Sequence, residues 1–357
     1  MTAVRIGTRG STLALTQTGI VADQVRRLGG LAPEEVELVR IRTEGDLYTG
    51  SLAALGGAGV FVAALREAVL AGRCDLAVHS LKDLPVVPAH GLVIAAVPER
   101  VDPRDALCAR DGLTLADLPH GARVGTGSPR RAAQLLAHRP DLEVVDIRGN
   151  VETRLGRVRG STTGPGDLDA VVLAAAGLSR LGRTSAVTEL LDTTVMSPAP
   201  GQGALAVECR SVLDGPTPRG VAPGPDLDDP SAPLARALTA LDHLPSHVAV
   251  HAERALLATL EAGCAAPVGA LGRLEHGTLR LDAVVSRGDG TEQVRSSAAV
   301  TLPAGRAEQL ASADALGRQV ALQLLDDGAA RLAPLGPVAL RSGDVGSSHL
   351  LGPGGTR

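Results

Sequence analysis

Short apolar runs alternate with stretches of helical periodicity along the first half of this chain. The runs that predict strands lie at residues 4–7, 36–41, 75–78, 92–97, 123–125, 143–147 and 169–174. Apolar residues recur with a helical period at residues 12–28, 60–71, 129–138 and 151–159, and Ser11 or Thr12 is the expected N-cap of the first helix. This alternation predicts α/β layers with largely parallel sheets, whose ligands bind at loops beyond the carboxyl ends of the strands.

The second half has a different pattern. Residues 204–209 predict one more strand, and the Pro-, Gly- and Asp-rich residues 211–233 predict a linker. Beyond the linker we expect a small α+β unit, with helices at residues 234–244, 247–260 and 307–325 and strands at 268–274, 279–286 and 297–302. The residues from about 333 onward are rich in Gly, Pro and Ser and are expected to be disordered.

Composition and charge narrow the class of protein. A length of 357 residues fits two or three domains, and Lys+Arg 35 against Asp+Glu 39 gives 35 − 39 = −4, which argues against a general nucleic-acid or anionic-membrane binder. No apolar run is long enough for a membrane helix, and the N-terminus lacks a signal-peptide pattern, so we expect a cytoplasmic protein. Four widely spaced cysteines without a Cys-x-x-Cys motif indicate neither a disulfide framework nor a zinc site, and no metal is expected.

Arginines gather at the predicted strand-to-helix junctions. The loop Gly-Thr-Gly-Ser-Pro-Arg-Arg ends at Arg131 and opens a helix, whose free amides favour an anion. Further arginines occupy corresponding junctions, namely Arg9, Arg148 and Arg154. Because guanidinium forks bind carboxylates in pairs of hydrogen bonds, this placement predicts a ligand with many carboxylates or phosphates. The alternative is that these arginines are solvated and neutralised by local ion pairs.

Two further segments carry reactive side chains. The sequence His-Ser-Leu-Lys82-Asp83-Leu-Pro follows a buried strand, and Lys82 is the only lysine of the chain. An amine and a carboxylate at a strand end could bind a ligand, and Asp83 could stabilise positive charge or move a proton; the alternative is a solvent-facing turn. Cys264 lies in a predicted loop of small residues, where a thiol is either an attachment point or a small packing residue. Cys74, Cys108 and Cys209 are expected only to pack.

Taken together, these segments resemble the hydroxymethylbilane synthase family, also called porphobilinogen deaminases. The resemblance covers roughly residues 4–302, and its blocks stand in the family's order. The blocks are residues 6–15 (IGTRGSTLAL), 59–62 (GVFV), 79–85 (HSLKDLP), 102–106 (DPRDA), 125–131 (GTGSPRR), 147–154 (IRGNVETR), 174–178 (AAAGL), 200–204 (PGQGA), 252–255 (AERA) and 263–264 (GC).

The resemblance implies an α/β fold with two periplasmic-binding-protein-like domains and a small α+β C-terminal domain that carries the cofactor cysteine. It places domain 1 at residues 1–98 and 196–218, domain 2 at 99–195 and domain 3 at 219–332, followed by a tail at 333–357. Family members act as monomeric transferases of tetrapyrrole and heme biosynthesis. They join four porphobilinogen molecules head to tail, with release of ammonia, on a dipyrromethane cofactor held by a thioether to the cysteine that matches Cys264.

The same resemblance implies roles for individual residues. It gives catalytic roles to Asp83, Lys82, Arg9 and Arg148. The implied cofactor-binding residues, besides Cys264, are Lys82, Asp83, Thr126, Ser128, Arg130 and Arg131. The implied substrate-binding residues are Arg9, Ser11, Arg148, Arg154 and Phe61, the last packing against a pyrrole ring.

The sequence departs from the family pattern at two loop positions. Ala54 and Ala58 stand where many members carry lysines, and Arg-for-Lys coding bias does not explain the loss of charge. This leaves open an alternative function, a slow or non-catalytic paralogue that acts as a polycarboxylate-binding module.

Overall fold

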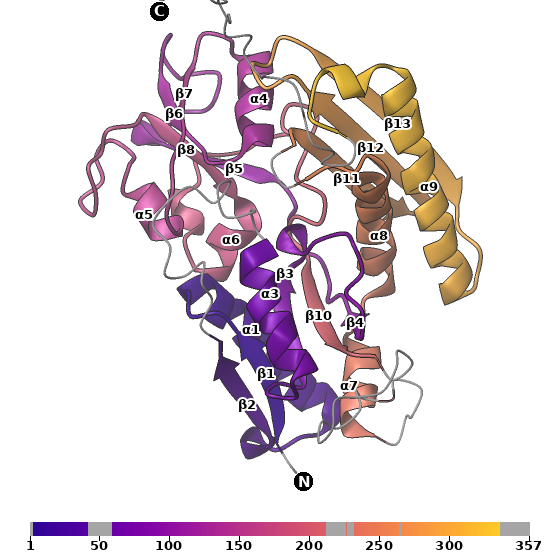
Figure 1. The fold of residues 1–357 in the computed structure, drawn as a ribbon. Coiled ribbons are helices and arrows are strands. Elements are labelled where there is room, and N and C mark those ends of the chain that lie inside the picture. The colour runs from indigo at the N-terminus through magenta and orange to yellow at the C-terminus, as the bar shows by residue number, and fades with distance from the viewer. Residues whose placement is uncertain (1–2, 42–58, 212–225, 227–231, 264–265, 336–357) are drawn as a thin grey trace, which may run out of the picture.

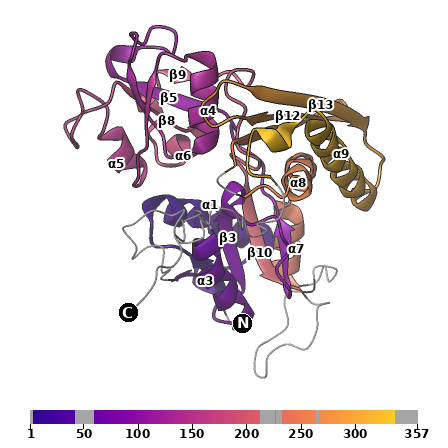
Figure 2. The same ribbon diagram turned by 45° about the horizontal axis from the view of Figure 1, so that its top comes forward.

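The computed structural model describes residues 3–41, 59–211, 226, 232–263 and 266–335, and the side chains of residues 59–61 are outside the description. Two lobes, each built on a five-stranded sheet, lie one above the other in Figure 1, and a C-terminal sheet with its helices lies beside them. The turned view in Figure 2 shows the same three parts.

The first sheet has the strand order β2-β1-β3-β10-β4. Its strands are β1 (Val4–Thr8), β2 (Val36–Arg40), β3 (Leu76–Ser80), β4 (Leu92–Ala96) and β10 (Leu205–Arg210). Strands β1, β2 and β3 are parallel, whereas β10 runs antiparallel to β3 and β4. Strand β4 therefore runs in the same direction as β1, β2 and β3, and the sheet is largely parallel, as the sequence pattern predicts, with β10 as its one reversed strand.

Helices cover both faces of this sheet. On one face, α1 (Thr12–Gly29) and α7 (Pro233–Leu241) share a core with β1, β3 and β10. On the other face lies α3 (Gly59–Leu70). Helix α1 begins at the expected residue, because Ser11 Oγ accepts a hydrogen bond from Ala14 N at 3.3 Å. Gly30 caps its C-terminus with a φ of 67°.

The second sheet repeats this plan with the order β7-β6-β8-β5-β9. Its strands are β5 (Asp105–Ala109), β6 (Arg123–Gly125), β7 (Glu143–Val145), β8 (Ala170–Ala174) and β9 (Glu189–Leu190), and its helices are α4 (Pro129–His138), α5 (Val151–Leu155) and α6 (Ala175–Arg180). Strands β6, β7 and β8 are parallel, and β5 is antiparallel to β8 and β9. In both sheets the reversed strand is the fourth in the order, β10 or β5, and it is the strand that the chain enters on crossing from the other lobe.

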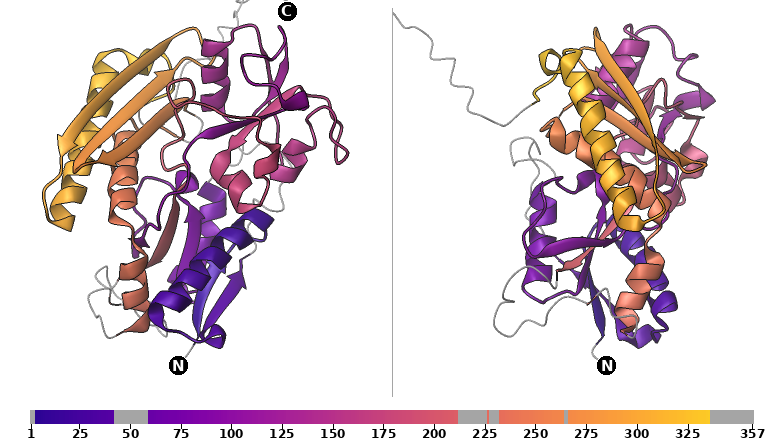
Figure 3. Two further views of the ribbon diagram at one scale, coloured as in Figure 1. Left: turned by 180° about the vertical axis from the view of Figure 1, so that it is seen from behind. Right: turned by 90° about the vertical axis from the view of Figure 1, so that its right-hand side faces the viewer.

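The C-terminal unit is a three-stranded antiparallel sheet packed on two helices. Strands β11 (Val268–Glu275), β12 (Thr278–Ser286) and β13 (Gln293–Thr301) follow one another, and α8 (Leu244–Thr259) and α9 (Arg306–Asp326) share a core with one face of the sheet. Figure 3 shows α9 lying along that sheet. The remaining helical turns are short 3-10 segments at Pro33–Glu35, Leu81–Asp83, Arg110–Gly112, Thr184–Ala186 and Ala329–Arg331.

Several boundaries differ from the sequence-based expectation. Helix α5 ends at Leu155 and not at residue 159, because Val158 forms a parallel bridge with Leu168 and Arg157 pairs with Asp167. Strand β13 begins at Gln293, four residues before the predicted start. Strands β5 and β9 and helix α6 are absent from the sequence-based prediction. The predicted linker at residues 211–233 and the tail lie almost entirely outside the described residues.

Candidate active site

Lys82 and Asp83 lie in the segment that follows the carboxyl end of β3, the central strand of the first sheet. It forms the 3-10 turn Leu81–Asp83, in which Leu81 is buried, Lys82 is half-buried and Asp83 is exposed. Leu81 N donates to Ala204 O at 3.0 Å, so the turn lies against the segment that enters β10. Gly201 has a φ of 77°, and a Cβ there would lie 3.1 Å from Lys82 N, so this close approach favours glycine.

Lys82 lies among positive charges. Its Nζ donates to Gln202 Oε1 at 3.4 Å. Burial lowers the pKa of Lys82 to about 8; the neighbouring Asp83 opposes this shift, and Arg131 and Arg130 add to it. A carboxylate of a bound ligand would stabilise the charged form of such an ammonium and raise its pKa again.

Arg130 and Arg131, at the start of α4, meet on one buried carboxylate. Asp105 Oδ2 accepts from Arg130 Nη2 at 2.8 Å, and Asp105 Oδ1 accepts from Arg131 Nη2 at 2.7 Å and from Gln202 Nε2 at 2.8 Å. These partners overcome burial and hold the pKa of Asp105 at about 2. Two arginines share one carboxylate, so the cluster keeps an excess positive charge beside Lys82. Within the described chain, Arg130 Nε is buried without a hydrogen-bond partner.

Arg148 and Arg154 lie at the next strand-to-helix junction of the second sheet. Arg148 is exposed, with Nη2 3.4 Å from Asp146 Oδ2, and Arg154 Nε donates to Gly149 O at 2.9 Å. The pKa of Arg154 is lowered first by burial and then by Arg131 and Arg148, while Asp146 and Asp83 oppose the shift. Asp83 of the first lobe therefore lies close enough to act electrostatically on Arg154 of the second lobe.

The structure describes some of the remaining predicted side chains and not others. Thr126 is buried and its Oγ1 accepts from Ser128 N at 3.2 Å, at the N-terminus of α4. Arg9 and Ser11 lie at the junction of β1 and α1, where the Ser11 hydroxyl caps the helix. The side chain of Phe61 lies outside the description, as do Ala54, Ala58 and Cys264.

The residues on either side of the pair 264–265 are described. Helix α8 precedes it, and Ala266 N donates to Gly263 O at 2.9 Å. On the same helix, Arg254 donates to Leu84 O at 2.9 Å and Pro85 O at 2.8 Å, directly after Asp83. The helix that leads to the cysteine is thus bound to the segment that carries Lys82 and Asp83.

Helix α8 also holds both segments that connect the two lobes. Glu253 is fully buried, and it accepts from Arg100 Nη1 at 2.6 Å and from Gly201 N at 2.5 Å. Arg100 follows β4 and Gly201 precedes β10, so one carboxylate joins the two crossings. Gly272 N also donates to Glu253, at 2.8 Å, and this bond connects the junction to β11.

The residues that accept hydrogen bonds from the lysine and arginine side chains of the site were not identified from the sequence. Asp105, Gln202 and Glu253 lie within the quoted blocks DPRDA, PGQGA and AERA, but only the structure gives them partners. A buried ion pair was missed in the same way, since Glu208 on β10 accepts from Arg66 at 2.9 Å and lies 3.3 Å from His79 Nε2. The usable signal is a charged or amide residue inside an otherwise apolar or Gly-rich run, where burial demands a partner.

Comparisons with known proteins show the family of this chain. The family described as "Porphobilinogen deaminase, dipyromethane cofactor binding domain" matches residues 4–214, and "Porphobilinogen deaminase, C-terminal domain" matches residues 247–326. The chain belongs to the porphobilinogen deaminase family. A porphobilinogen deaminase of Cutibacterium acnes is 54% identical over 346 residues, covering 94% of this chain and 98% of that protein. The porphobilinogen deaminase of Leifsonia xyli subsp. xyli is 54% identical and covers 93% of this chain and 95% of that protein.

A solved structure gives a much looser match. A TRAP solute binding protein from a marine metagenome, specific for aromatic acid ligands, is 10% identical with a TM-score of 0.35, covering 93% of this chain and 94% of that one. The family assignment rests on the sequence relatives.

Family membership confirms the main expectations from sequence. The fold has two α/β lobes, each built on a five-stranded sheet, and an α+β C-terminal domain, and the enzyme is a transferase of tetrapyrrole biosynthesis that uses dipyrromethane. The three described cysteines, Cys74, Cys108 and Cys209, are buried and unpaired, and burial raises the pKa of Cys108 to about 12. Among the described residues, no helix combines the length and apolarity needed to cross a bilayer.

Proposed function

We propose that this chain converts porphobilinogen to linear hydroxymethylbilane through the residues gathered around Lys82 and Asp83. In the reaction, four porphobilinogen molecules join head to tail with loss of four ammonia molecules, and one water supplies the hydroxyl group of the released linear product. The observation that carries the proposal is a chain of contacts: Lys82, next to Asp83, donates to Gln202, and Gln202 donates to Asp105. Asp105 also accepts hydrogen bonds from Arg130 and Arg131.

The residues present fit a dipyrromethane cofactor. When bound, this group supplies the free pyrrole carbon to which the first substrate is joined. Its acidic side chains match the donor set at α4, where Arg130 Nε is buried without a partner in the described chain and Lys82 gains from a nearby carboxylate. Residues that would hold it are Lys82, Asp83, Thr126, Ser128, Arg130 and Arg131, with Cys264 as the point of attachment.

The arginines divide into two kinds. Arg130 and Arg131 direct most of their N–H groups into the fold, toward Asp105, Ser197 O and Val172 O, and so contribute fixed positive charge. Arg148 is exposed and only weakly engaged with Asp146, so its guanidinium can bind a substrate carboxylate. Together with Arg9, Ser11 and Arg154, it would bind the acetate and propionate groups that accumulate as the product grows.

Asp83 would carry the chemical step. Its carboxylate is exposed at the end of the 3-10 turn and can accept hydrogen bonds from pyrrole N–H groups. In that position it would stabilise the positive charge that develops on the substrate as ammonia leaves. Phe61, on α3, would pack against a pyrrole ring.

The proposal extends to the setting of the enzyme. We propose that it acts in the cytoplasm as a monomer, with domain 1 at residues 1–98 and 196–218, domain 2 at 99–195 and domain 3 at 219–332. The absence of a long apolar helix among the described residues is compatible with the proposed cytoplasmic location. The joining of β10 to the first sheet supports the division into domains.

Intact mass of the native protein tests the proposal directly. We expect the mass to exceed that of the polypeptide by two linked pyrrole units, and Cys264→Ala to remove this increment. The matched control is Cys209→Ala, because Cys209 is buried in β10 and its pKa is raised by burial to about 12, so the adduct should remain. Bare polypeptide mass after incubation with porphobilinogen would contradict the proposal.

A further inference from the structure

The outer face of the C-terminal sheet carries three arginines. Arg273 on β11, Arg280 on β12 and Arg295 on β13 lie on the face that is turned away from α8 and α9. The strand register places Arg273 directly opposite Arg280. Like charges opposite one another destabilise a sheet, so negative charge near a cross-strand pair of arginines is stabilising.

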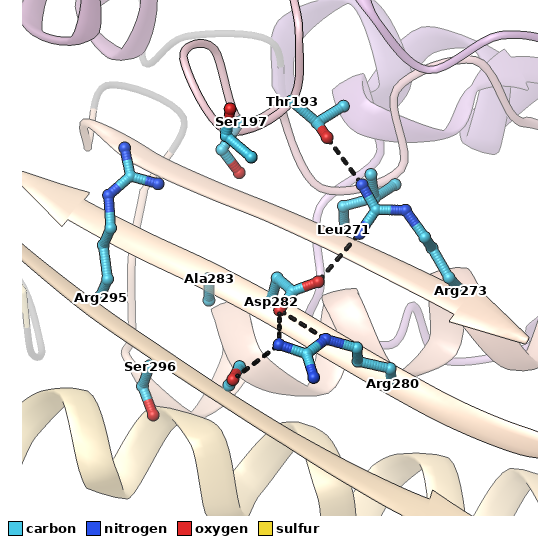
Figure 4. Close-up of a pocket in the computed structure, with 11 residues that line it drawn as sticks. Thr193, Ser197, Leu271, Arg273, Arg280, Asp282, Ala283, Arg295 and Ser296 are labelled. Atoms are coloured by element: carbon cyan, nitrogen blue, oxygen red, sulfur yellow. Dashed lines mark hydrogen bonds and ion pairs between the residues drawn. The ribbon is translucent and has the colours of Figure 1, made fainter.

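A cavity of about 380 Å³ lies over these arginines. Its floor includes Leu271 and Ala283, and its wall is the segment of residues 193–197 that leads from β9 toward β10, with the hydroxyls of Thr193, Thr194 and Ser197. Figure 4 shows Arg273, Arg280 and Asp282 grouped on the sheet, with Arg295 farther along it and Thr193 and Ser197 above. This cavity is separate from the group around Lys82 and Asp83.

Among the described residues, a single carboxylate lines the cavity. Three arginines against Asp282 give 3 − 1 = +2. Asp282 accepts from Arg273 Nη1 at 2.9 Å and from Arg280 Nε at 2.9 Å, so it is shared between two cations. Nearby Asp192 is engaged by Thr194, whose N and Oγ1 donate to it at 2.8 and 2.6 Å.

Arg295 is the least compensated of the three arginines. Its Nη2 donates to the neutral Gln293 Oε1 at 3.0 Å. In the described part of the chain no carboxylate lies within ion-pair distance of it. A planar guanidinium with uncommitted N–H groups, at the rim of a net positive cavity, is suited to bind an oxyanion through two parallel hydrogen bonds.

We propose that this cavity binds a small molecule with two or more carboxylate or phosphate groups. Arg280 and Arg295 would bind its anionic groups, Ser297 and Ser197 would supply hydroxyl donors, and Leu271 would contact its carbon skeleton. The proposal goes beyond the condensation reaction, since none of these residues belongs to the catalytic group.

The wall of the cavity is shared with the catalytic region. Ser197 O accepts from Arg130 Nη1 at 2.5 Å and from Gln134 Nε2 at 3.0 Å. On its other side this segment is bound to β11, where Pro198 O accepts from Ala270 N at 2.9 Å. A bound anion would therefore contact the segment that also holds Arg130 in place.

Calorimetric titration of the cofactor-bearing full chain tests the proposal, with pyrophosphate and citrate as the two probes. The double variant R280Q/R295Q should weaken binding of at least one probe by about tenfold or more, because it removes charge-assisted hydrogen bonds. The matched control is R287Q on the same hairpin, where Arg287 pairs with Glu292 at 2.6 Å outside the cavity, and it should bind like wild type. The probe that binds more tightly identifies phosphate or carboxylate as the preferred group.

Two further measurements prevent an ambiguous result. R295Q alone removes no ion pair of the described chain, so it should fold like wild type and still weaken the probe severalfold. Crystals soaked in selenate should show an anomalous peak beside Arg280 and Arg295. Binding unaffected by both variants, no binding of either probe, or a selenate peak confined to the Lys82 region would overturn the proposal. Porphobilinogen turnover without probe should be unchanged in R280Q/R295Q, which separates this test from that of the catalytic proposal.

Discussion

Lys82 Nζ lies 3.4 Å from Gln202 Oε1, and this contact joins the end of β3 to the segment that enters β10. The same amide donates from Nε2 to Asp105 Oδ1 at 2.8 Å. Gln202 thus links the single lysine to the carboxylate on which Arg130 and Arg131 meet. Burial, together with the charges of Arg131 and Arg130, lowers the pKa of this amine to about 8.

The first prediction concerns the pH dependence of substrate binding. Lys82 loses its charge as pH rises through about 8, so the KM for porphobilinogen should rise across that range. Lys82→Arg should remove this inflexion, because a guanidinium stays protonated, while Lys82→Gln should raise KM about tenfold at pH 7. A KM profile from pH 6 to 10 provides the measurement. An inflexion near pH 8 that survives in Lys82→Arg would assign it to another group.

The same lowered pKa has a consequence for stability. The unfolded chain holds this proton up to its ordinary pKa of 10.5, whereas the folded chain releases it near 8. Between these values the unfolded state binds more protons, so this group makes the free energy of unfolding rise with pH in that window. Urea unfolding of Lys82→Gln in the absence of ligand should lack that rise.

The second prediction concerns Asp105. Asp105→Asn leaves two buried arginines without their carboxylate and should lower the free energy of unfolding by about 3–5 kcal/mol. In wild type the contribution of Asp105 is complete above its ordinary pKa of 3.8 and is lost as pH falls through about 2. Urea unfolding from pH 7 downward measures both effects. The control is Asp111→Asn, whose carboxylate is exposed; equal losses in the two variants would contradict the argument.

The third prediction separates chemistry from folding at Asp83. Asp83→Asn should lower kcat by about 10²–10⁴ and leave the unfolding midpoint unchanged, because the side chain is exposed. Single-turnover ammonia release is the measurement. The exposed Glu275→Gln on β11 serves as control and should retain full turnover. Near-normal turnover of Asp83→Asn would remove Asp83 from the chemical step.

The fourth prediction concerns elongation. Arg148→Leu should leave intermediates with too few pyrrole units, visible as added mass on the protein, because an exposed guanidinium available to a growing polycarboxylate is lost. Arg157→Leu is the matched control, since Arg157 pairs with Asp167 and lies outside the proposed group. Full product yield from Arg148→Leu, at the wild-type rate, would count against this role.

Much of the fold could be predicted because local signals agree with burial. The helix Pro129–His138 has the predicted bounds, with proline at its first position, and the Ser11 cap places the start of α1. Strands β5 and β9 were missed, since the Asp105–Ala109 strand is short and begins with a buried acid. That acid is tolerated only because Arg130, Arg131 and Gln202 reach it from distant parts of the chain, and no local pattern reports such a pairing.

Pairings between distant parts of the chain also limit what the sequence can predict about the site. Strand-to-helix loops pointed to Arg148 and Arg154, and the structure brings Arg154 and Asp83 within electrostatic reach. The sequence does not distinguish Arg130 and Arg131, directed into the fold, from the exposed Arg148, because all three occupy similar junctions. The distinction comes from Asp105, which lies at the first position of its own strand.

The bond set of Glu253 has a consequence for how the enzyme accommodates its product. Two-lobed receptors commonly open and shut about the strands that join their halves. Here one buried carboxylate from α8 accepts hydrogen bonds from Arg100 and Gly201, one on each connection, so any movement that separates the two connections would break these bonds. We therefore expect room for successive rings to come from side chains and loops, while the third domain keeps the two connections together.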